Sequence, residues 1–152
     1  MVLWRLTRRP HADLSGLGGE LADGRWHTRG RPVVYCAATA ALAVLEVRVH
    51  LDLPLELLPD DYVLMKIVAP DELDAPALQA SDLPDAWRDH EDLCRPFGDS
   101  WLRDGATALL SVPSAIVEVE RNLLLNPRHP AAARVHVEGI DPFGWDRRLF
   151  RS

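Results

Sequence analysis

Apolar and polar positions alternate at the start of this chain and then give way to continuous apolar runs. Residues 2–6 (VLWRL) alternate after the first position, as a half-buried strand does. Two later runs, 33–36 (VVYC) and 61–69 (DYVLMKIVA), are rich in apolar and β-branched residues, so we expect both to form strands. The first half of the chain therefore predicts a sheet whose strands are separated by other elements.

A helical period appears between the second and third of these segments. Thr39 is a suitable N-cap, and the apolar positions Leu42, Leu45 and Val49 recur three and four residues apart. We expect a helix from this cap to about residue 50, with these three side chains facing the core.

The second half of the chain predicts short helices and strands in no repeating order. The expected helices are 85–93, ended by Pro96, and 98–104, ended by Gly105. The expected strands are 107–112, 115–119 and 134–139. Several non-repeating strands with few helices favour an α+β fold over a regular βαβ series, and 152 residues suit a single domain.

The composition is that of a globular chain with an acidic balance. Hydrophobic residues make up 47% and charged residues 26%, and the net charge of -6 counts against direct nucleic-acid binding. No apolar run approaches the ~18 residues of a membrane helix, and the arginine-containing N-terminus lacks the apolar segment of a signal peptide. Cys36 and Cys94 form no CxxC pair. We therefore expect a cytoplasmic protein with two free thiols, or with one disulfide.

Positive charge gathers in one segment, 24–31 (GRWHTRGR), just before the expected strand 33–36. Its glycines let the backbone approach a ligand closely, and its three guanidinium groups can bind phosphate through paired hydrogen bonds. The alternative is a solvated basic loop with Trp26 packed in the core. Composition alone leaves both interpretations open.

Three other side chains are candidates for chemistry. Glu46 lies beside the apolar face of its helix, where an ionised carboxylate is costly unless it is paired or functional; the alternative is a boundary glutamate that reaches water. Tyr35 ends an apolar run, where the alternative role is core packing. Ser114 lies between two expected strands, where a serine commonly serves a turn.

Known catalytic motifs are absent from the sequence. The six histidines show no metal-ligand spacing, and there is no GxSxG, GxxxxGK[ST] or GxGxxG motif. We therefore expect neither a metal ion nor an organic cofactor.

Several short motifs, taken in order, resemble those of the RES domain family. The segments 16–37 (GLGGELADGRWHTRGRPVVYCA) and 40–50 (AALAVLEVRVH) resemble its opening, and 111–130 (SVPSAIVEVERNLLLNPRHP) resembles its closing signature. The resemblance extends from residue 4 to about residue 137, and the ordered set is specific although each motif alone is weak. One departure is His27, where the family usually has asparagine.

The family is named for an arginine, a glutamate and a serine. The resemblance places them at Arg25, Glu46 and Ser114, and places a family tyrosine at Tyr35. Ser111 is a second candidate for the serine. The remaining matches to the closing signature are Asn122, Asn126, Pro127, His129 and Pro130.

The resemblance implies both a fold and a biological role. The fold is a split mixed β-sheet core flanked by helices, similar to ADP-ribosyltransferases, in one domain over residues 1–152. The role is that of the toxin in a type II toxin–antitoxin pair, with NAD as substrate. A helix-turn-helix antitoxin of the Xre type would cover the active site, in a hetero-oligomer of unspecified stoichiometry.

The implied reaction breaks the bond between nicotinamide and ribose in NAD. Arg25 would clamp a phosphate, Tyr35 would stack on nicotinamide with Trp26 contributing to binding, Glu46 would stabilise the oxocarbenium-like transition state, and Ser114 would orient the nicotinamide or the ribose. The acceptor of ADP-ribose stays open: water makes a glycohydrolase, phosphate a phosphorylase and a protein side chain an ADP-ribosyltransferase. A catalytically inactive partner-binding module is a third possibility, against which the intact arginine, tyrosine and glutamate count.

Overall fold

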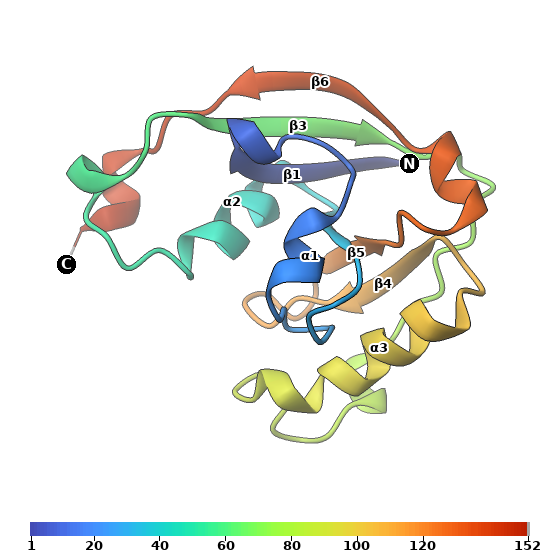
Figure 1. Cartoon of the computed structure of the whole chain (residues 1–152). Helices are drawn as coiled ribbons and strands as arrows, with labels where there is room; N and C mark the ends of the chain where they lie inside the picture. The colour runs from blue at the N-terminus through green and yellow to red at the C-terminus, as the bar shows by residue number, and fades with distance from the viewer. Residues whose placement is uncertain (152) are drawn as a thin grey trace.

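One six-stranded sheet organises the chain (Figure 1). In this computed structural model, which describes residues 1–151, the strands lie in the order β4-β5-β2-β1-β3-β6. Their bounds are β1 Val2–Arg8, β2 Val34–Ala37, β3 Tyr62–Val68, β4 Leu109–Pro113, β5 Arg121–Leu125 and β6 His136–Pro142. Neighbouring strands are antiparallel, and an isolated parallel bridge joins Ala77 to Ser111.

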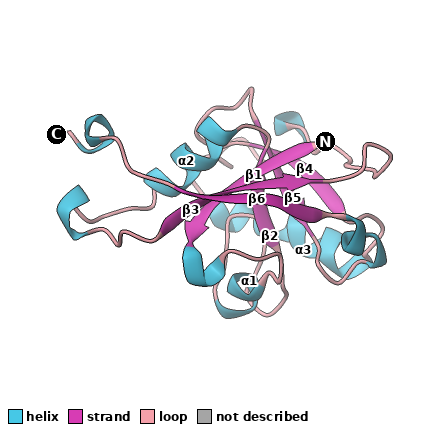
Figure 2. Cartoon of the chain, turned by 90° about the horizontal axis from the view of Figure 1, so that it is seen from above, coloured by secondary structure: helices cyan, strands magenta, loops and turns pink. Residues whose placement is uncertain are grey.

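The sheet is split at its centre. Strand β1 pairs along its full length with β3, whereas β1 and β2 share only the pair Trp4 and Ala37. Two three-stranded halves therefore form, with β1, β3 and β6 in one half and β2, β5 and β4 in the other. Figure 1 shows the first half above β4 and β5, and in Figure 2, seen from above, strands of the two halves cross. The expected single α+β domain with a split sheet is confirmed, whereas the expected mixed sheet is corrected to an antiparallel one, in which the bridge between Ala77 and Ser111 is the parallel contact among residues 1–151.

Short helices connect and flank the strands. The α-helices are α1 Leu17–Leu21, α2 Ala40–Arg48 and α3 Arg95–Asp104. The 3-10 helices are η1 Arg9–His11, η2 Leu55–Leu57, η3 Ala80–Asp82, η4 Glu91–Leu93, η5 Pro130–Arg134 and η6 Arg147–Phe150. Among the described residues, no helix has both the length and the apolar character needed to cross a membrane.

Helix α2 begins as predicted but ends earlier. The Thr39 hydroxyl accepts a hydrogen bond from the Leu42 amide at 3.2 Å, which is the expected N-cap. Leu42 is buried and Leu45 half-buried, whereas Val49 is 53% exposed. The expectation that Val49 faces the core is therefore wrong: the helix ends at Arg48, and Val49, its C-cap residue, is left exposed.

Two other predicted elements are corrected by the structure. Residues 85–93 form turns and the short η4 rather than a helix, and Pro96 lies in the first turn of α3, where its missing N–H costs no helical hydrogen bond. Residues 115–119 form a loop rather than a strand, because the Ser114 hydroxyl accepts hydrogen bonds from the amides of Ile116 and Val117. Gly105 ends α3 at φ 62°, as predicted.

The core is formed on both faces of the sheet. One apolar cluster joins the two halves through side chains that include Leu3, Met65 and Leu125. A second cluster packs α3 and the segment before it on the other face, around Trp26, Trp87 and Trp101 with Leu124 of β5. The conformation of the arginine-containing segment 24–31 is therefore fixed by a buried tryptophan.

Helix α3 packs directly on the backbone of that segment. A Cβ atom added at Gly98 would lie 1.7 Å from the carbonyl oxygen of Trp26, closer than any real contact. Two further bonds fix the same interface: the Thr28 amide donates to Asp99 at 2.8 Å, and Arg95 Nε donates to the Gly24 carbonyl at 2.9 Å. Only glycine at position 98 permits this approach.

The Gly98→Ala variant should be less stable than the wild type. Overpacking against an immobile backbone costs about 3 kcal/mol, which for a chain of this length lowers Tm by about 6–12 °C. Calorimetry measures the difference. The matched control is Gly18→Ala, since an added Cβ there meets nothing within 4 Å and alanine favours a helix. Equal Tm values for the two variants would contradict the packing argument.

Candidate active site

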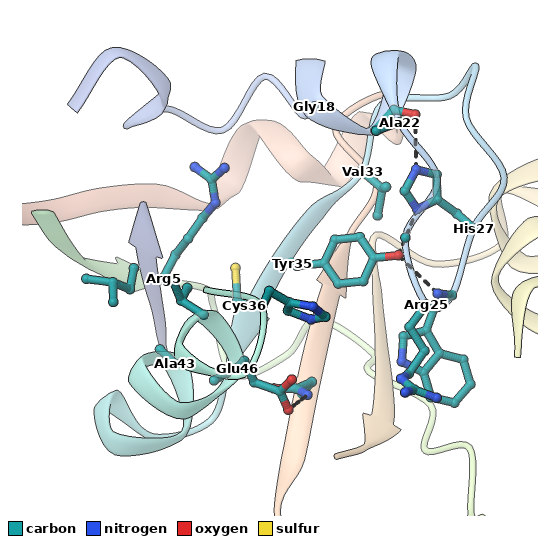
Figure 3. A pocket seen from close by; sticks show the side chains of 18 of the residues that line it. Arg5, Gly18, Ala22, Arg25, His27, Val33, Tyr35, Cys36, Ala43 and Glu46 are labelled. Atoms are coloured by element: carbon teal, nitrogen blue, oxygen red, sulfur yellow. Dashed lines mark hydrogen bonds between the residues drawn. The ribbon is translucent and has the colours of Figure 1, made fainter. Parts of the chain in front are cut away.

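A cavity of about 600 Å³ opens between the glycine-rich α1 region, strand β2 and helix α2 (Figure 3). Its lining includes the ionisable or polar side chains of Arg25, Tyr35, Glu46, Glu91 and Asn122. Register places Tyr35 opposite Leu124, and Asn122 lies two residues before Leu124, so both side chains emerge on one face of the sheet. Four of the residues proposed from the sequence, Arg25, Trp26, Tyr35 and Glu46, thus line one cavity, and Ser114 does not.

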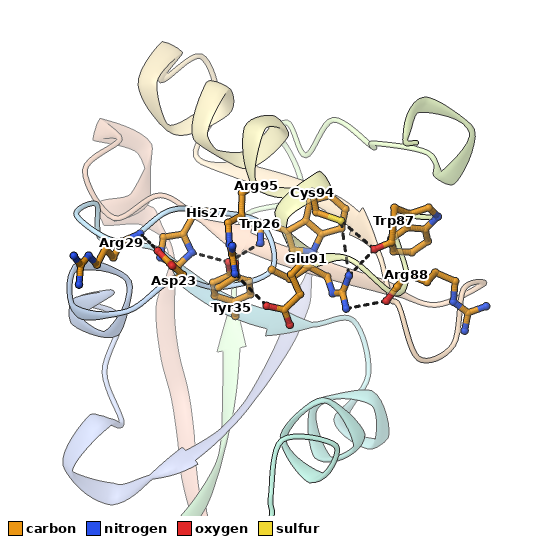
Figure 4. A network of polar contacts seen from close by, with 12 residues as sticks. Asp23, Trp26, His27, Arg29, Tyr35, Trp87, Arg88, Glu91, Cys94 and Arg95 are labelled. Atoms are coloured by element: carbon orange, nitrogen blue, oxygen red, sulfur yellow. Dashed lines mark hydrogen bonds and ion pairs between the residues drawn. The ribbon is translucent and has the colours of Figure 1, made fainter. Parts of the chain in front are cut away.

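Tyr35 projects from β2 into this cavity, and its hydroxyl is held by the segment 24–31 (Figure 4). The oxygen accepts a hydrogen bond from the Trp26 amide at 3.1 Å and lies 2.7 Å from His27 Nδ1. His27 Nε2 lies 3.0 Å from the Gly19 carbonyl, which can only accept. Nε2 therefore donates to Gly19, and in the neutral ring Nδ1 accepts the proton of the tyrosine hydroxyl. Burial raises the pKa of Tyr35, so this hydroxyl stays protonated.

Gly24 is required by the same arrangement. A Cβ atom at this position would lie 2.3 Å from the Tyr35 hydroxyl oxygen and 2.9 Å from His27 Nδ1. The first residue of the GRW motif is therefore glycine because the tyrosine hydroxyl occupies the space of a side chain.

Arg25 reaches across the cavity to the turn before η4. Its Nη1 donates to the Trp87 carbonyl at 2.8 Å and its Nη2 donates to the Arg88 carbonyl at 3.2 Å. Within residues 1–151, Nε–H and the second N–H of Nη2 have no protein acceptor. One donor face of the guanidinium is therefore available for an anion.

Trp26 contributes its backbone to the site and its ring to the core. The indole is 2% exposed, and its centroid lies 6.3 Å from that of Trp87. The packed-core interpretation of Trp26 is confirmed, and the ring offers no exposed face for a ligand to stack on. The arginines beside it, Arg29 and Arg31, are exposed at the surface.

Glu46 projects from α2, and its carboxylate accepts hydrogen bonds from two side chains. The Ser114 hydroxyl donates to Glu46 Oε1 at 2.8 Å, and Asn122 Nδ2 donates to the same oxygen at 2.7 Å. Ser114 is fully buried behind the carboxylate, whereas Ser111 instead accepts from Arg121 Nε at 2.9 Å. Of the two serines considered, Ser114 is the one that contacts the candidate glutamate.

The sequence assigned no role to three residues of this site. Asn122 was noted only as part of the closing signature, and His27 only as a departure from the family pattern. Glu91, at the cavity wall, carried no signal at all; it pairs with Arg95 at 3.4 Å. Each of these roles depends on a contact with a residue distant in the sequence or on the placement of a loop.

Neither cysteine is paired, and the residue types that bind metals are scattered among the described residues. Cys36 and Cys94 are free and buried, and burial raises the pKa of the Cys36 thiol to about 12. In the described part of the chain, no three histidine, cysteine, aspartate or glutamate side chains gather as metal ligands would. The cavity therefore brings together the Glu46 carboxylate held by two donors, the Tyr35 ring and the Arg25 guanidinium, with Arg5 and Glu91 also on its wall.

Known proteins resemble this chain over nearly its whole length. The model of the RES domain family matches residues 2–146. The chain is 44% identical over 152 residues to the protein named Toxin Res of Pseudomonas putida strain KT2440, a match that covers 99% of this chain and 100% of that one. It is 42% identical over 148 residues to the Prs ADP-ribosylating toxin of Sphingobium sp. strain YBL2, covering 92% of this chain and 88% of that one.

A solved structure shares the fold. A chain in the crystal structure of the M. tuberculosis MbcT–MbcA toxin–antitoxin complex matches with a TM-score of 0.75, covering 93% of this chain and 83% of that one at 18% identity. The family model and the relatives cover all of the segments that resemble the RES domain in the sequence. The chain therefore belongs to the RES domain family.

Proposed function

We propose that this protein cleaves the bond between nicotinamide and ribose in NAD, as the toxin of a toxin–antitoxin pair. One observation carries the proposal: the Glu46 carboxylate, held by two donors, lines a cavity of about 600 Å³ together with Tyr35 and Arg25. A volume in this range suits a dinucleotide-sized ligand.

The main chemical requirement of this reaction is a negative charge held in a fixed position near the ribose. Nicotinamide leaves as a neutral pyridine from a cationic one, so the departure needs no general acid, unlike ordinary glycoside cleavage with its two carboxylates. What develops in the transition state is positive charge on the ribose. A fixed carboxylate stabilises that charge without reorganising, and Glu46 is a carboxylate of this kind.

Arg25 and Tyr35, on the wall of the cavity opposite Glu46, would bind the dinucleotide. The free donor face of Arg25 suits one phosphate of the pyrophosphate. The ring of Tyr35, whose hydroxyl is tied back to the segment 24–31, suits the cationic nicotinamide ring, at about 0.5–2 kcal/mol by analogy with cation–π pairs.

The acceptor of ADP-ribose distinguishes three candidate activities. Water or phosphate makes the protein an NAD glycohydrolase or phosphorylase that depletes NAD. A protein side chain makes it an ADP-ribosyltransferase, which is favoured by the name of the Sphingobium relative, an ADP-ribosylating toxin. The first half of the reaction, and the role of Glu46 in it, is common to all three.

Replacing the carboxylate should remove the activity and keep the fold. Glu46→Gln retains shape but loses the charge, so we expect nicotinamide release to fall at least about 100-fold while the Tm stays within a few degrees. Mass spectrometry of nicotinamide, ADP-ribose and modified protein measures the activity and identifies the acceptor. Glu56→Gln, an exposed glutamate on η2 outside the cavity, is the matched control. Near-normal turnover by Glu46→Gln would remove this residue from the mechanism.

The reaction should proceed without a metal or an organic cofactor, because protein groups supply each element of the proposed chemistry. Purified protein treated with a chelator and dialysed should release nicotinamide from NAD at the untreated rate. Loss of activity on chelation, restored by a divalent metal, would be the opposite result.

An antitoxin that covers the cavity should compete with NAD. We propose an Xre-type helix-turn-helix partner that blocks the cavity entrance and offers a carboxylate to Arg25. A saturating non-hydrolysable NAD analogue should therefore weaken partner binding at least about tenfold, a coupling of about 1.4 kcal/mol. Calorimetric titration measures both affinities. Unchanged partner affinity would instead indicate binding elsewhere, such as at the acidic stretch 71–92.

A further inference from the structure

Two hydrogen bonds to Glu46 end on the same oxygen. Asn122 Nδ2 and the Ser114 hydroxyl lie 2.7 Å and 2.8 Å from Oε1, and within residues 1–151 no protein donor contacts Oε2 (Figure 3). The two oxygens of one carboxylate thus have different surroundings. One is saturated by the protein, and the other remains available to a ligand in the cavity.

We propose that Asn122 is a positioning residue, which with Ser114 locks Oε1 and thereby directs Oε2 of Glu46 at the ribose of the bound dinucleotide. The inference rests on the proposed function, since it specifies how the carboxylate of that same site is oriented. Asn122 itself acts through Glu46.

The hydrogen-bond directions around Ser114 support this assignment. Its oxygen accepts from the amides of Ile116 at 3.1 Å and Val117 at 3.2 Å, so its single proton is free to donate only to Glu46. The side chain is fully buried. Ser114 therefore holds the carboxylate and does not reach the nicotinamide or the ribose directly.

The backbone around Asn122 makes this donor a rigid one. Asn122 lies on β5, paired on one side with Ala37 of β2 and on the other with Val112 of β4. A donor on a strand that is paired on both sides is held more accurately than a donor on a loop. Glu46, by contrast, has three flexible side-chain torsions, and two fixed donors from different directions remove that freedom.

The same contacts also stabilise the fold, so the test must separate the two effects. A donor to a carboxylate favours its ionised form, and a second carboxylate beside it favours the protonated form. Asn122→Asp is isosteric and puts a carboxyl group beside Oε1, where like charges would share a proton. Activity that depends on ionised Glu46 should then be lost at a higher pH than in the wild type.

The experiment is the pH dependence of kcat for nicotinamide release by the full-length protein. For Asn122→Asp we expect the acid limb to move up by about one pH unit or more. For Asn122→Ala, which removes the donor, we expect kcat to fall about 10- to 100-fold with KM changed less than threefold. Ser114→Ala should move the acid limb in the same direction as Asn122→Asp.

The control is Asn126→Ala, on the chain's other asparagine. Its side chain is buried and accepts from the Arg128 amide at 3.1 Å, away from Glu46. This variant should lose Tm without moving the pH profile. If both Asn122 variants had the pH profile and kcat of the wild type while Glu46→Gln was inactive, the positioning role alone would be overturned. An active Glu46→Gln would overturn the proposed function, and the positioning role with it.

Discussion

A carboxylate beside the apolar face of a short helix is the constraint around which this site is organised. Glu46 is half-buried, and an ionised group in such a place needs donors. The two donors come from the end of β4 and from β5, so one oxygen atom fixes helix α2, the strand pair β4–β5 and the loop at 115–119 relative to one another. The loop conformation follows from the same serine, which binds two of the loop amides.

The opposite wall is set by close packing rather than by charge. Gly98 lets α3 contact the backbone at Trp26, and Gly24 leaves room for the Tyr35 hydroxyl. The buried Trp26 ring then fixes the short turn from which Arg25 projects. Two glycines and a buried tryptophan, which take no part in the proposed chemistry, thus determine where the Tyr35 ring and the Arg25 guanidinium line the cavity.

Local signals in the sequence were enough for much of the fold. The alternating start, the apolar run before Tyr35, the Thr39 cap and the glycine that ends α3 depend on neighbours a few residues away, and the structure contains each. Position 49 and the segments 85–93 and 115–119 were predicted wrongly, the last because the Ser114 hydroxyl accepts hydrogen bonds from the amides of Ile116 and Val117, which a strand would need for pairing. The arginine segment with Arg25, and Tyr35, Glu46 and Ser114, were candidates from residue type and position, and the family resemblance then gave each of them a role. Asn122 gained a role only through its bond to Glu46, 76 residues away in the chain.

A structure of the protein with a non-hydrolysable NAD analogue tests the central claim most directly. The account predicts that Glu46 Oε2 lies within hydrogen-bonding distance, about 2.6–3.2 Å, of the ribose on the nicotinamide side, while Oε1 keeps its bonds to Ser114 and Asn122. The Tyr35 ring should lie against the nicotinamide. An analogue bound outside the cavity, or a ribose out of reach of Glu46, would contradict it.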